Sequence, residues 1–360
     1  MKTTDVRVRR AIAAVAAGHP VVLTDDTAPD TDGHLVFAAD DATPKLLAFT
    51  IRHTSGYVRV ALPGDECERL NLPPMCHTNG GEFGTAAHRV SVDYRGPGTG
   101  ISATDRARTI AALASADSAA SDFLRPGHVV PVRAECEGVL ERRGPIEAAI
   151  DLVRLAGRRP AAALCEIVSR DRPTAMARRR ELFEFAVAHA LPIVSIGELV
   201  AYRRRTEPQV VRLAETILPL RGGDSRVIGF RDVHDGGEHL AVIIGTVGPG
   251  VPVPLHVHVE CLTGDVFGSA ACRCGGELDS ALTTMAAQGG GVIVYLRPAR
   301  SLRACGLPES DSPAADLTSE TVAWILRDLG VYTIRLSEDT PGFGLVMFGA
   351  IREYGLRAAG

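Results

Sequence analysis

Three cysteines between Val259 and Leu278 constrain this chain more than any other feature of its sequence. Cys261, Cys272 and Cys274 lie close together, and the last two flank a single arginine before a pair of glycines. Thiolates bind Zn²⁺ tightly, and three protein ligands with a fourth position open to water are typical of catalytic zinc sites. Alternatively they are small buried side chains, because free cysteine is among the most buried residue types. Three cysteines in so short a segment favour a metal, and we predict zinc at these positions.

Length and charge limit the classes of protein to which the chain can belong. With 360 residues, 46% of them hydrophobic and 23% charged, it is long enough for two domains of ordinary globular composition. A net charge of −4 creates no field that attracts nucleic acid or an anionic membrane. No aromatic stacking platform accompanies the arginine runs at 178–180 and 203–205, so these runs indicate solvated helix faces. We expect no nucleic acid and no membrane as partners.

The N-terminal residues and the distribution of cysteines predict a cytoplasmic protein. The segment from Met1 to Arg10 is charged, and no apolar signal region follows it. No uninterrupted apolar segment approaches the length of a membrane span. Most of the eight cysteines are scattered rather than arranged as a compact secreted scaffold, which indicates reduced thiols.

The segment from Thr24 to His34 is a second candidate for a metal site. It carries four aspartates, including Asp30 and Asp32, and we predict that it forms a loop. Like charges at this density are unfavourable unless they are solvated or neutralised by a cation, and hard oxygen donors suit Mg²⁺. From composition alone, a solvated surface loop explains the segment better than a bound ion.

Local patterns predict several helices and strands. Thr43 followed by proline predicts an N-cap with proline at the first helical position. A helix that opens at residues 101–106 offers free N–H groups to a phosphate, although capping by Ser102 or Thr104 explains the same residues. Residues 206–208 resemble a linker, and strands are predicted at 210–218, 225–232 and 238–245.

The first part of the chain resembles 3,4-dihydroxy-2-butanone 4-phosphate synthase. The resemblance is carried by residues 100–110 (GISATDRARTI), 126–131 (PGHVVP), 147–157 (EAAIDLVRLAG), 164–167 (LCEI) and 196–204, and it covers nearly all of residues 1–205. It implies a compact α/β domain that dimerises, with the active site near the subunit interface. The implied activity is that of a lyase, which converts ribulose 5-phosphate by Mg²⁺-assisted enolisation and rearrangement into a four-carbon phosphate and formate.

The resemblance assigns roles to individual residues of this first part. His128 and Glu166 match two essential catalytic positions. Asp30 stands where the family has a metal-binding and substrate-binding Glu, and His34 replaces a substrate-binding Asp. The family's Arg-x-Gly-His-Thr-Glu motif gives Arg142 and Gly144 substrate-binding roles, but its metal-binding His is replaced by Pro145, which suits the first turn of a helix. A site for Mg²⁺ or Mn²⁺ at Asp30 would therefore be weakened, and we predict weak or absent synthase activity.

Residues 238–297 resemble GTP cyclohydrolase II. The matching segments are 238–245, 258–265 (HVECLTGD), 272–274 (CRC) and 290–297 (GGVIVYLR). In that family three cysteines hold a Zn²⁺ whose water attacks the guanine ring, and Cys261, Cys272 and Cys274 match them. Glu260 matches a substrate-binding position that contacts GTP, and Asp316 matches a catalytic proton acceptor. The match is shortened beyond Arg297, Thr318 replaces a catalytic Arg, and acidic residues 337–341 replace a triphosphate-binding motif. We predict that GTP is not turned over.

Together these features predict a mixed α/β (α+β) protein of two domains. Residues 1–205 form the synthase-like domain, and residues 206–360 form a shortened cyclohydrolase-like α/β domain. One hypothesis is a working riboflavin biosynthesis enzyme that acts on ribulose 5-phosphate. The alternative is a non-catalytic homologue, or pseudoenzyme, that acts as a zinc-stabilised partner or regulatory subunit in a homodimer or in a heterodimer with an active homologue. A third possibility is new chemistry at the zinc site.

Overall fold

The computed structural model divides the chain into two compact units, Met1–Arg203 and Arg204–Gly360. It describes residues 3–26, 32–75, 87–220, 223–234, 236–247, 251–297, 304–305, 315–336 and 354–358. None of the helices in these ranges combines the length and the apolar character that crossing a membrane requires. Asp30 lies outside the described residues, and so do residues 337–341.

The first unit is built on a mixed sheet in the order β4-β5-β3-β6-β2-β1-β7. β3 runs parallel to β5 and antiparallel to β6, and β2 runs antiparallel to both β6 and β1. The strands are β1 (Val21–Thr24), β2 (Gly33–Ala38), β3 (Arg59–Leu62), β4 (Val92–Tyr94), β5 (Phe123–Arg133), β6 (Ala162–Glu166) and β7 (Ile193–Ser195).

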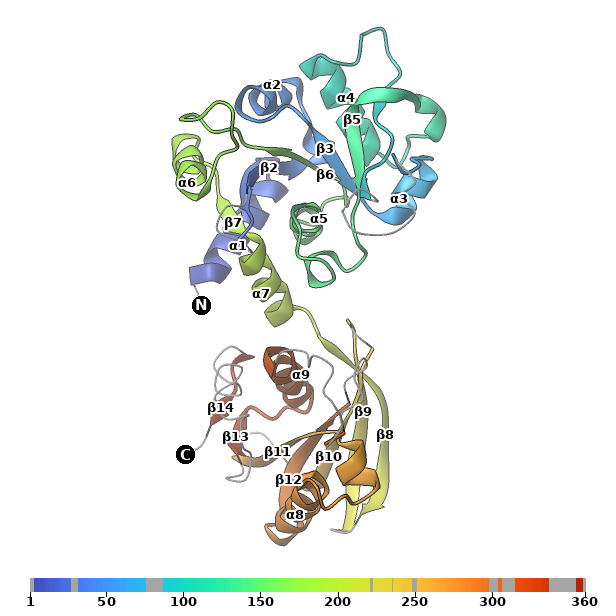
Figure 1. Ribbon diagram of the computed structural model, residues 1–360, viewed down its shortest axis with the longest axis vertical. Helices are drawn as coiled ribbons and strands as arrows, with labels where there is room; N and C mark the ends of the chain where they lie inside the picture. Colours follow the sequence, from blue (N-terminus) through green and yellow to red (C-terminus); the bar gives the residue numbers. More distant parts are fainter. Residues whose placement is uncertain are drawn as a thin grey trace. The chain divides into compact units, whose positions relative to one another are not determined.

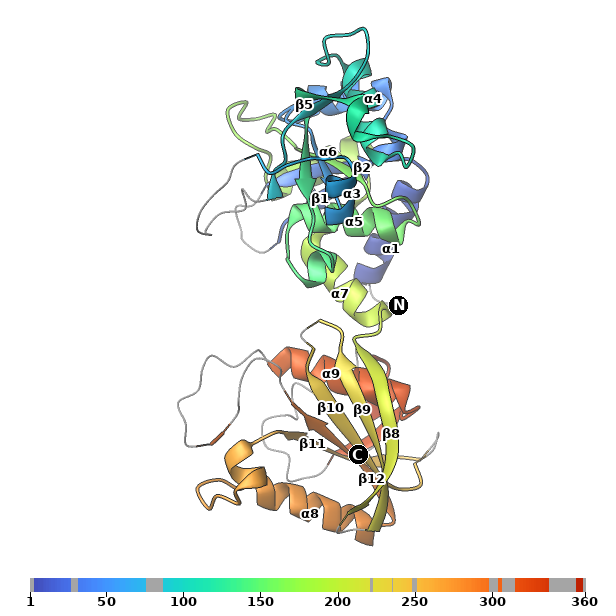
Figure 2. The ribbon, with the colours of Figure 1, turned by 90° about the vertical axis from the view of Figure 1, so that its right-hand side faces the viewer.

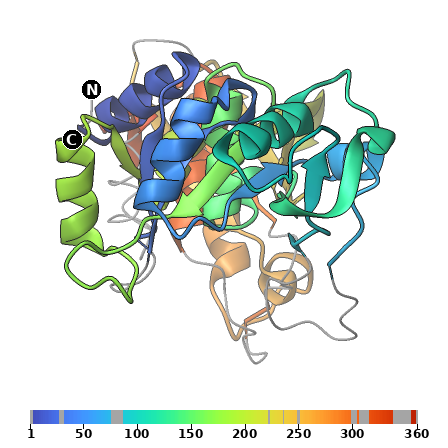
Figure 3. The same cartoon turned by 90° about the horizontal axis from the view of Figure 1, so that it is seen from above.

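Helices cover both faces of this sheet because its strands are apolar on both sides. Successive strand residues point to opposite faces, so Val36 packs in one core and Phe37 in the other. One face carries α1 (Thr3–Ala16), α5 (Pro145–Leu155) and α7 (Ile196–Thr206), and the other carries α2 (Pro44–His53), α3 (Gly64–Arg69), α4 (Ala103–Ala114) and α6 (Arg179–Ala188). Figure 1 shows α2 and α4 on the opposite side of the strands from α5, and Figure 3 shows α2 and α4 as neighbours. Short 3-10 turns lie at η1 (Ala39–Asp41), η3 (Ala120–Asp122) and η4 (Gly138–Leu140).

Two predicted helix starts are confirmed, and one loop prediction is wrong. Thr43 caps α2 by accepting a hydrogen bond from the Leu46 N–H at 3.2 Å, with proline at the first helical position. Ser102 caps α4 by accepting from the Asp105 N–H at 3.0 Å, so capping accounts for this helix start. His34 was predicted in a loop, but it lies in β2 and is buried, because strand pairing with β6 already includes it.

The second unit contains a sheet in the order β14-β13-β11-β12-β10-β9-β8. Its antiparallel half confirms the three predicted strands, and β11, β12 and β13 run parallel to one another. The strands are β8 (Val210–Leu220), β9 (Gly223–Asp232), β10 (Glu238–Gly245), β11 (Val253–Val259), β12 (Gly290–Leu296), β13 (Thr333–Leu336) and β14 (Arg357–Ala358).

Two helices pack on opposite faces of this second sheet, as Figure 2 shows. Ile244 and Ile293 form a small core with α8 (Cys274–Ala287), whereas their neighbours Ile243 and Val292 belong to the larger core under α9 (Ala315–Asp328). The alternation along β10 and β12 therefore assigns each helix its face. α8 starts at one of the predicted zinc-binding cysteines, so its packing on the sheet fixes the position of that residue.

Candidate functional site

Strand register brings several predicted site residues of the first unit to the same end of neighbouring strands in its sheet. His34 on β2 lies opposite Glu166 on β6, and Arg59 on β3 pairs with Leu164 of β6 and Val130 of β5. His128 is two residues before Val130 in β5, so its side chain lies on the same face of the sheet as that of Val130 and near the same end of the strands. The predicted residues His34, Glu166 and His128 thus come from three different strands.

The Glu166 carboxylate is held by an arginine that the sequence analysis did not single out. Arg59 Nη2 donates to Glu166 Oε1 and lies 3.1 Å from His34 Nε2. Ser55 Oγ donates to the other carboxylate oxygen at 3.2 Å. Arg59 and His34 are both buried, so this ion pair is shielded from bulk water.

The surroundings of Glu166 keep it ionised. Burial raises the pKa of its carboxyl, but the His34 imidazole and the charge of Arg59 outweigh burial and lower that pKa to about 2. A general acid or base is most effective when its pKa lies near the working pH. Glu166 is therefore suited to an ion pair and poorly suited to carrying a proton at neutral pH.

His128 is oriented by Asp93, a residue that the sequence analysis did not identify. Asp93 Oδ2 lies 2.7 Å from His128 Nδ1, and Asp93 Oδ1 accepts from the His128 backbone N–H at 2.9 Å. Asp93 is buried, whereas the His128 side chain is 39% exposed. Gly100 passes so close that a Cβ there would lie 2.1 Å from Asp93 Oδ2, and its φ of +86° also requires glycine. The dyad presents an oriented imidazole to solvent.

Arg142 and Gly144 belong to a separate group around the start of α5. Arg142 Nη2 donates to the buried carboxylate of Glu147, and this hydrogen bond raises the pKa of Arg142. Gly144 is the N-cap residue of α5, and Pro145 occupies the first turn, as predicted. Pro145 thus serves the helix, and its ring has no atom that binds a metal.

The second unit brings four cysteine thiols together. Cys261, Cys272 and Cys274 are joined by Cys305, and the four Sγ atoms lie within 4.8 Å of one another. The Sγ separations are 3.9 Å between Cys261 and Cys272 and 3.7 Å between Cys274 and Cys305. Within the described part of the chain, this is the single group of three or more candidate metal ligands. Cys305 was missed because it follows Cys274 at a long interval and lies beyond residues 238–297, on which the sequence resemblance rested.

Close packing of two backbone segments assembles this cluster. Cys261 follows β11, and a single π-helical turn, η5 (Leu262–Val266), then reverses the chain toward the start of α8. A Cβ on Gly264 would lie 2.8 Å from Cys272 Sγ, and a Cβ on Gly275 would lie 2.5 Å from Gly264 O. Both glycines are therefore needed for η5 to approach α8, which places Cys261 beside Cys272 and Cys274.

Asp265 ties the cluster to the sheet. Its Oδ2 accepts from the Cys261 N–H at 2.9 Å and from the Tyr295 O–H at 2.8 Å. His258 Nε2 lies 3.0 Å from both carboxylate oxygens, and its ring stacks on that of Tyr295. Burial, followed by the hydrogen bond to Asp265, raises the pKa of Tyr295, so its hydroxyl stays protonated and donates. Asp265 thus holds the backbone of Cys261 in a fixed position relative to β12 and β11.

The surroundings of the Cys261 thiol favour its ionised form. Burial raises its pKa, but hydrogen bonds from the backbone of Cys305, from Thr263 and from Gly264 outweigh burial and lower its pKa to about 6. The Gly264 N–H donates to Cys261 Sγ at 3.4 Å. Since the thiolate is the form that binds metals, Cys261 has the chemistry of a ligand at neutral pH.

The remaining predicted residues lie beside this cluster or lack a described side chain. Glu260 follows β11, and its Oε1 accepts from Arg297 Nε at 3.1 Å. Asp316 lies in α9, but its side chain is outside the described part of the structure. Its predicted role as a proton acceptor therefore stays a prediction.

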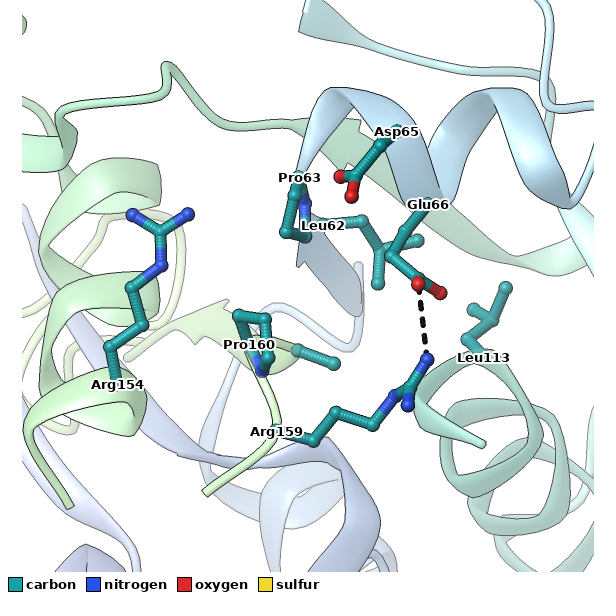
Figure 4. A pocket seen from close by; sticks show the side chains of 9 residues that line it. Leu62, Pro63, Asp65, Glu66, Leu113, Arg154, Arg159 and Pro160 are labelled. Carbon is teal, nitrogen blue, oxygen red and sulfur yellow. Dashed lines mark hydrogen bonds and ion pairs between the residues drawn. The ribbon is translucent and has the colours of Figure 1, made fainter. Parts of the chain in front are cut away.

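A cavity of about 270 Å³ in the first unit is separate from these residues (Figure 4). It lies at the end of β3 that carries Leu62, whereas Arg59 lies at the other end of that strand. Arg159 points across it and donates to Glu66 Oε1 at 3.0 Å, and Glu66 Oε2 accepts from Arg69 at 2.7 Å. Both oxygens of the Glu66 carboxylate are therefore paired with arginines, so the cavity offers no unpaired carboxylate to a ligand at Glu66.

Comparisons with known proteins give the same two-part composition. Residues 9–202 match the family model for 3,4-dihydroxy-2-butanone 4-phosphate synthase, and residues 211–349 match that for GTP cyclohydrolase II. The riboflavin biosynthesis protein RibBA of Nocardia farcinica is 46% identical, with 94% of this chain and 88% of that protein covered. RibBA of Salinispora tropica is 45% identical, with 96% of this chain and 92% of that protein covered.

Solved structures resemble the whole chain and its first unit. RibBX, described as a two-domain 3,4-dihydroxy-2-butanone 4-phosphate synthase from A. baumannii, has a TM-score of 0.68 and 31% identity, covering 98% of this chain and 99% of its own. A 3,4-dihydroxy-2-butanone 4-phosphate synthase in complex with two magnesium ions has a TM-score of 0.52 and 38% identity, covering 56% of this chain and 97% of its own. The two-domain α/β architecture is thus shared with RibBX.

The Glu166 ion pair predicts a specific loss of stability in acid. Because the folded pKa of Glu166 lies below its ordinary value of 4.5, its contribution is complete above about pH 4.5 and is lost as the pH falls toward about 2. The difference in unfolding free energy between wild type and Glu166→Gln should therefore shrink by about 3 kcal/mol over that window. Urea denaturation at a series of pH values measures it.

Glu184→Gln is the matched control for this experiment. Glu184 pairs with Arg180 on the surface of α6, where solvent screens the pair. The difference in unfolding free energy between wild type and Glu184→Gln should therefore change little with pH. If the difference in unfolding free energy between wild type and Glu166→Gln stays constant between about pH 4.5 and 2, the ion pair is contradicted.

The packing of η5 on α8 predicts opposite effects for two glycines. Gly264→Ala should lower the free energy of unfolding of the second unit by about 1–3 kcal/mol, because the added methyl overlaps Cys272 Sγ. Gly276→Ala is the control, since a Cβ there meets open space and alanine favours the helix. Equal denaturation midpoints for the two variants would show that the close approach is not required.

Proposed function

Because this chain belongs to the riboflavin biosynthesis family that joins 3,4-dihydroxy-2-butanone 4-phosphate synthase to GTP cyclohydrolase II, we propose that it is a member with two remodelled reaction centres. In this proposal the first unit has weak or no synthase activity, and the second unit does not hydrolyse GTP. The observation that carries the proposal is the Arg59 guanidinium held on the Glu166 carboxylate.

The ion pair opposes the first step of the synthase reaction. Enolisation of ribulose 5-phosphate removes a proton beside a carbonyl, which requires a base of suitable pKa and a cation to stabilise the enolate. Glu166, with a pKa of about 2, is too weak a base at neutral pH. Arg59 also occupies an oxygen of Glu166 that a substrate hydroxyl or a cation would otherwise contact, and its charge repels a second cation.

The metal site of the first unit lacks a ligand in this proposal. Pro145 begins α5 where the resemblance expects a metal-binding histidine, and Arg142 is engaged by Glu147. Asp30 alone would then hold Mg²⁺ or Mn²⁺, and a divalent ion that loses a direct protein ligand binds more weakly. The oriented His128 remains, which supports binding of a small phosphorylated sugar such as ribulose 5-phosphate with little turnover.

In the second unit we assign zinc to Cys261, Cys272 and Cys274. A zinc–sulfur bond of about 2.3 Å gives a tetrahedral site Sγ separations of about 3.8 Å. The separation of 3.9 Å between Cys261 and Cys272 fits this value. A zinc ion held there stabilises the fold of the unit, and it acts as a Lewis acid where a coordination position stays open to water.

A second candidate function is that of a partner subunit in a homodimer or in a heterodimer with an active homologue. The observation that favours it is β8, which lies at the edge of its sheet among the described strands. It exposes large apolar side chains, with Ile217 68% and Leu213 46% exposed. A long apolar edge strand is a surface for pairing with another chain.

Formate release tests the proposed loss of synthase activity. With ribulose 5-phosphate and Mg²⁺, the purified chain should release formate at least about 100-fold more slowly than an active synthase, as expected for the loss of a general base. Combining Asp30→Glu, Arg59→Ala and Pro145→His should raise the rate, because it restores both expected ligands and frees Glu166. Wild-type turnover equal to that of the active synthase would refute the proposal.

Native mass spectrometry tests the partner-subunit function. Wild type should be dimeric, and Ile217→Asp should shift it toward monomer because a charge opposes pairing along β8. Val233→Asp is the control, since Val233 is 40% exposed but lies in the turn after β9. An unchanged dimer in the Ile217→Asp variant would exclude β8 as the contact.

A further inference from the structure

We propose that Cys305 is the fourth ligand of a closed, tetrahedral zinc site with Cys261, Cys272 and Cys274. This inference deepens the proposed function, because it rests on the assignment of zinc to the first three cysteines. It differs in its consequence: a site with four protein ligands leaves no position for water and is structural, whereas a site with three is open.

The positions of the sulfur atoms fit four ligands. Cys305 Sγ lies 3.7 Å from Cys274 Sγ, which matches the edge of about 3.8 Å expected for a ZnS₄ tetrahedron. The second pair, Cys261 and Cys272, is separated by 3.9 Å, so two independent edges agree. Both separations are far longer than the bond of about 2.05 Å in a disulfide.

Cys305 is anchored to the same turn that carries the other ligands. Thr263 Oγ1, in η5, donates to the Cys305 carbonyl oxygen at 3.2 Å and lies 3.4 Å from Cys261 Sγ. The preceding residue, Ala304, is buried. One threonine therefore holds the backbone of Cys305 beside the sulfur of Cys261, although the two cysteines are far apart in the sequence.

The surroundings of the cluster suit a site with excess negative charge. Four thiolates around Zn²⁺ carry a net charge of −2. Cys274 is the first residue of the 14-residue helix α8, whose N-terminus has a partial positive charge and free N–H groups. The Gly264 N–H also points at Cys261 Sγ. Both features stabilise thiolates.

A fourth thiolate explains how the second unit keeps a zinc site without hydrolytic chemistry. An open site activates a bound water, but here the Cys305 sulfur occupies that position. The ion then contributes folding free energy, as structural zinc does in small domains. The cluster can therefore persist in a chain that does not act on GTP.

Zinc K-edge X-ray absorption of the full-length wild-type chain tests the ligand count directly. We expect one zinc per chain with four sulfur neighbours at about 2.3 Å. In Cys305→Ser the shell should change to three sulfurs and one oxygen or nitrogen, and zinc affinity should fall by at least about 100-fold. Cys136→Ser is the matched control, because Cys136 is an exposed free cysteine of the first unit.

The outcomes of these measurements distinguish two proposals: zinc bound by Cys261, Cys272 and Cys274, and Cys305 as the fourth ligand. Three sulfurs and one lighter atom in wild type, unchanged in Cys305→Ser, would overturn the fourth ligand and leave zinc at three cysteines standing. Zinc stoichiometry near zero in protein prepared with zinc would overturn both. Four sulfurs in wild type support the closed site even where the Cys305→Ser variant fails to fold.

Discussion

The close approach of two backbone segments at Gly264 and Gly275 is the constraint on which the second unit's site depends. Neither position has room for a Cβ, so η5 lies directly against the start of α8. That contact turns Cys261 toward Cys272 and Cys274, and it leaves Asp265 facing the sheet, where Tyr295 and His258 bind its carboxylate. Because the sheet fixes Asp265 and Asp265 fixes the Cys261 backbone, the fold of the unit itself holds Cys261 in the cysteine cluster.

In each unit a residue occupies a position in the candidate site without disturbing the frame around it. In the first unit Arg59 occupies an oxygen of Glu166, and the strands on either side keep their register. Pro145 begins α5 as a helix-starting proline should, at the position where the resemblance implies a metal-binding histidine. In the second unit the sulfur of Cys305 lies 3.7 Å from that of Cys274, and in the site that we propose it takes the position of a zinc-bound water. Fold and chemistry depend on different atoms, so one can be conserved while the other changes.

Local patterns in the sequence predicted local structure well. Capping at Thr43 and Ser102 depends on residues three positions apart, and the structure contains both caps. The prediction for His34 failed because the acidic residues before it suggested a loop. Its pairing with Glu166 depends on a strand far along the chain, and that pairing makes it part of β2. The cytoplasmic location and the role of Asp316 stay predictions.

The sequence by itself determined the family, the order of the two domains and three of the four clustered cysteines. Each of these follows from a motif whose residues are neighbours in the chain, so residue identity and spacing in the sequence are enough to recognise it. The tertiary structure decided which distant residues meet: Arg59 with Glu166, Asp93 with His128, and Cys305 with Cys274. Such contacts follow from strand register and from the paths of loops, which depend on packing across the whole domain. The contacts of a charged strand residue such as Arg59, or of an isolated cysteine such as Cys305, can therefore be recognised only in the folded chain.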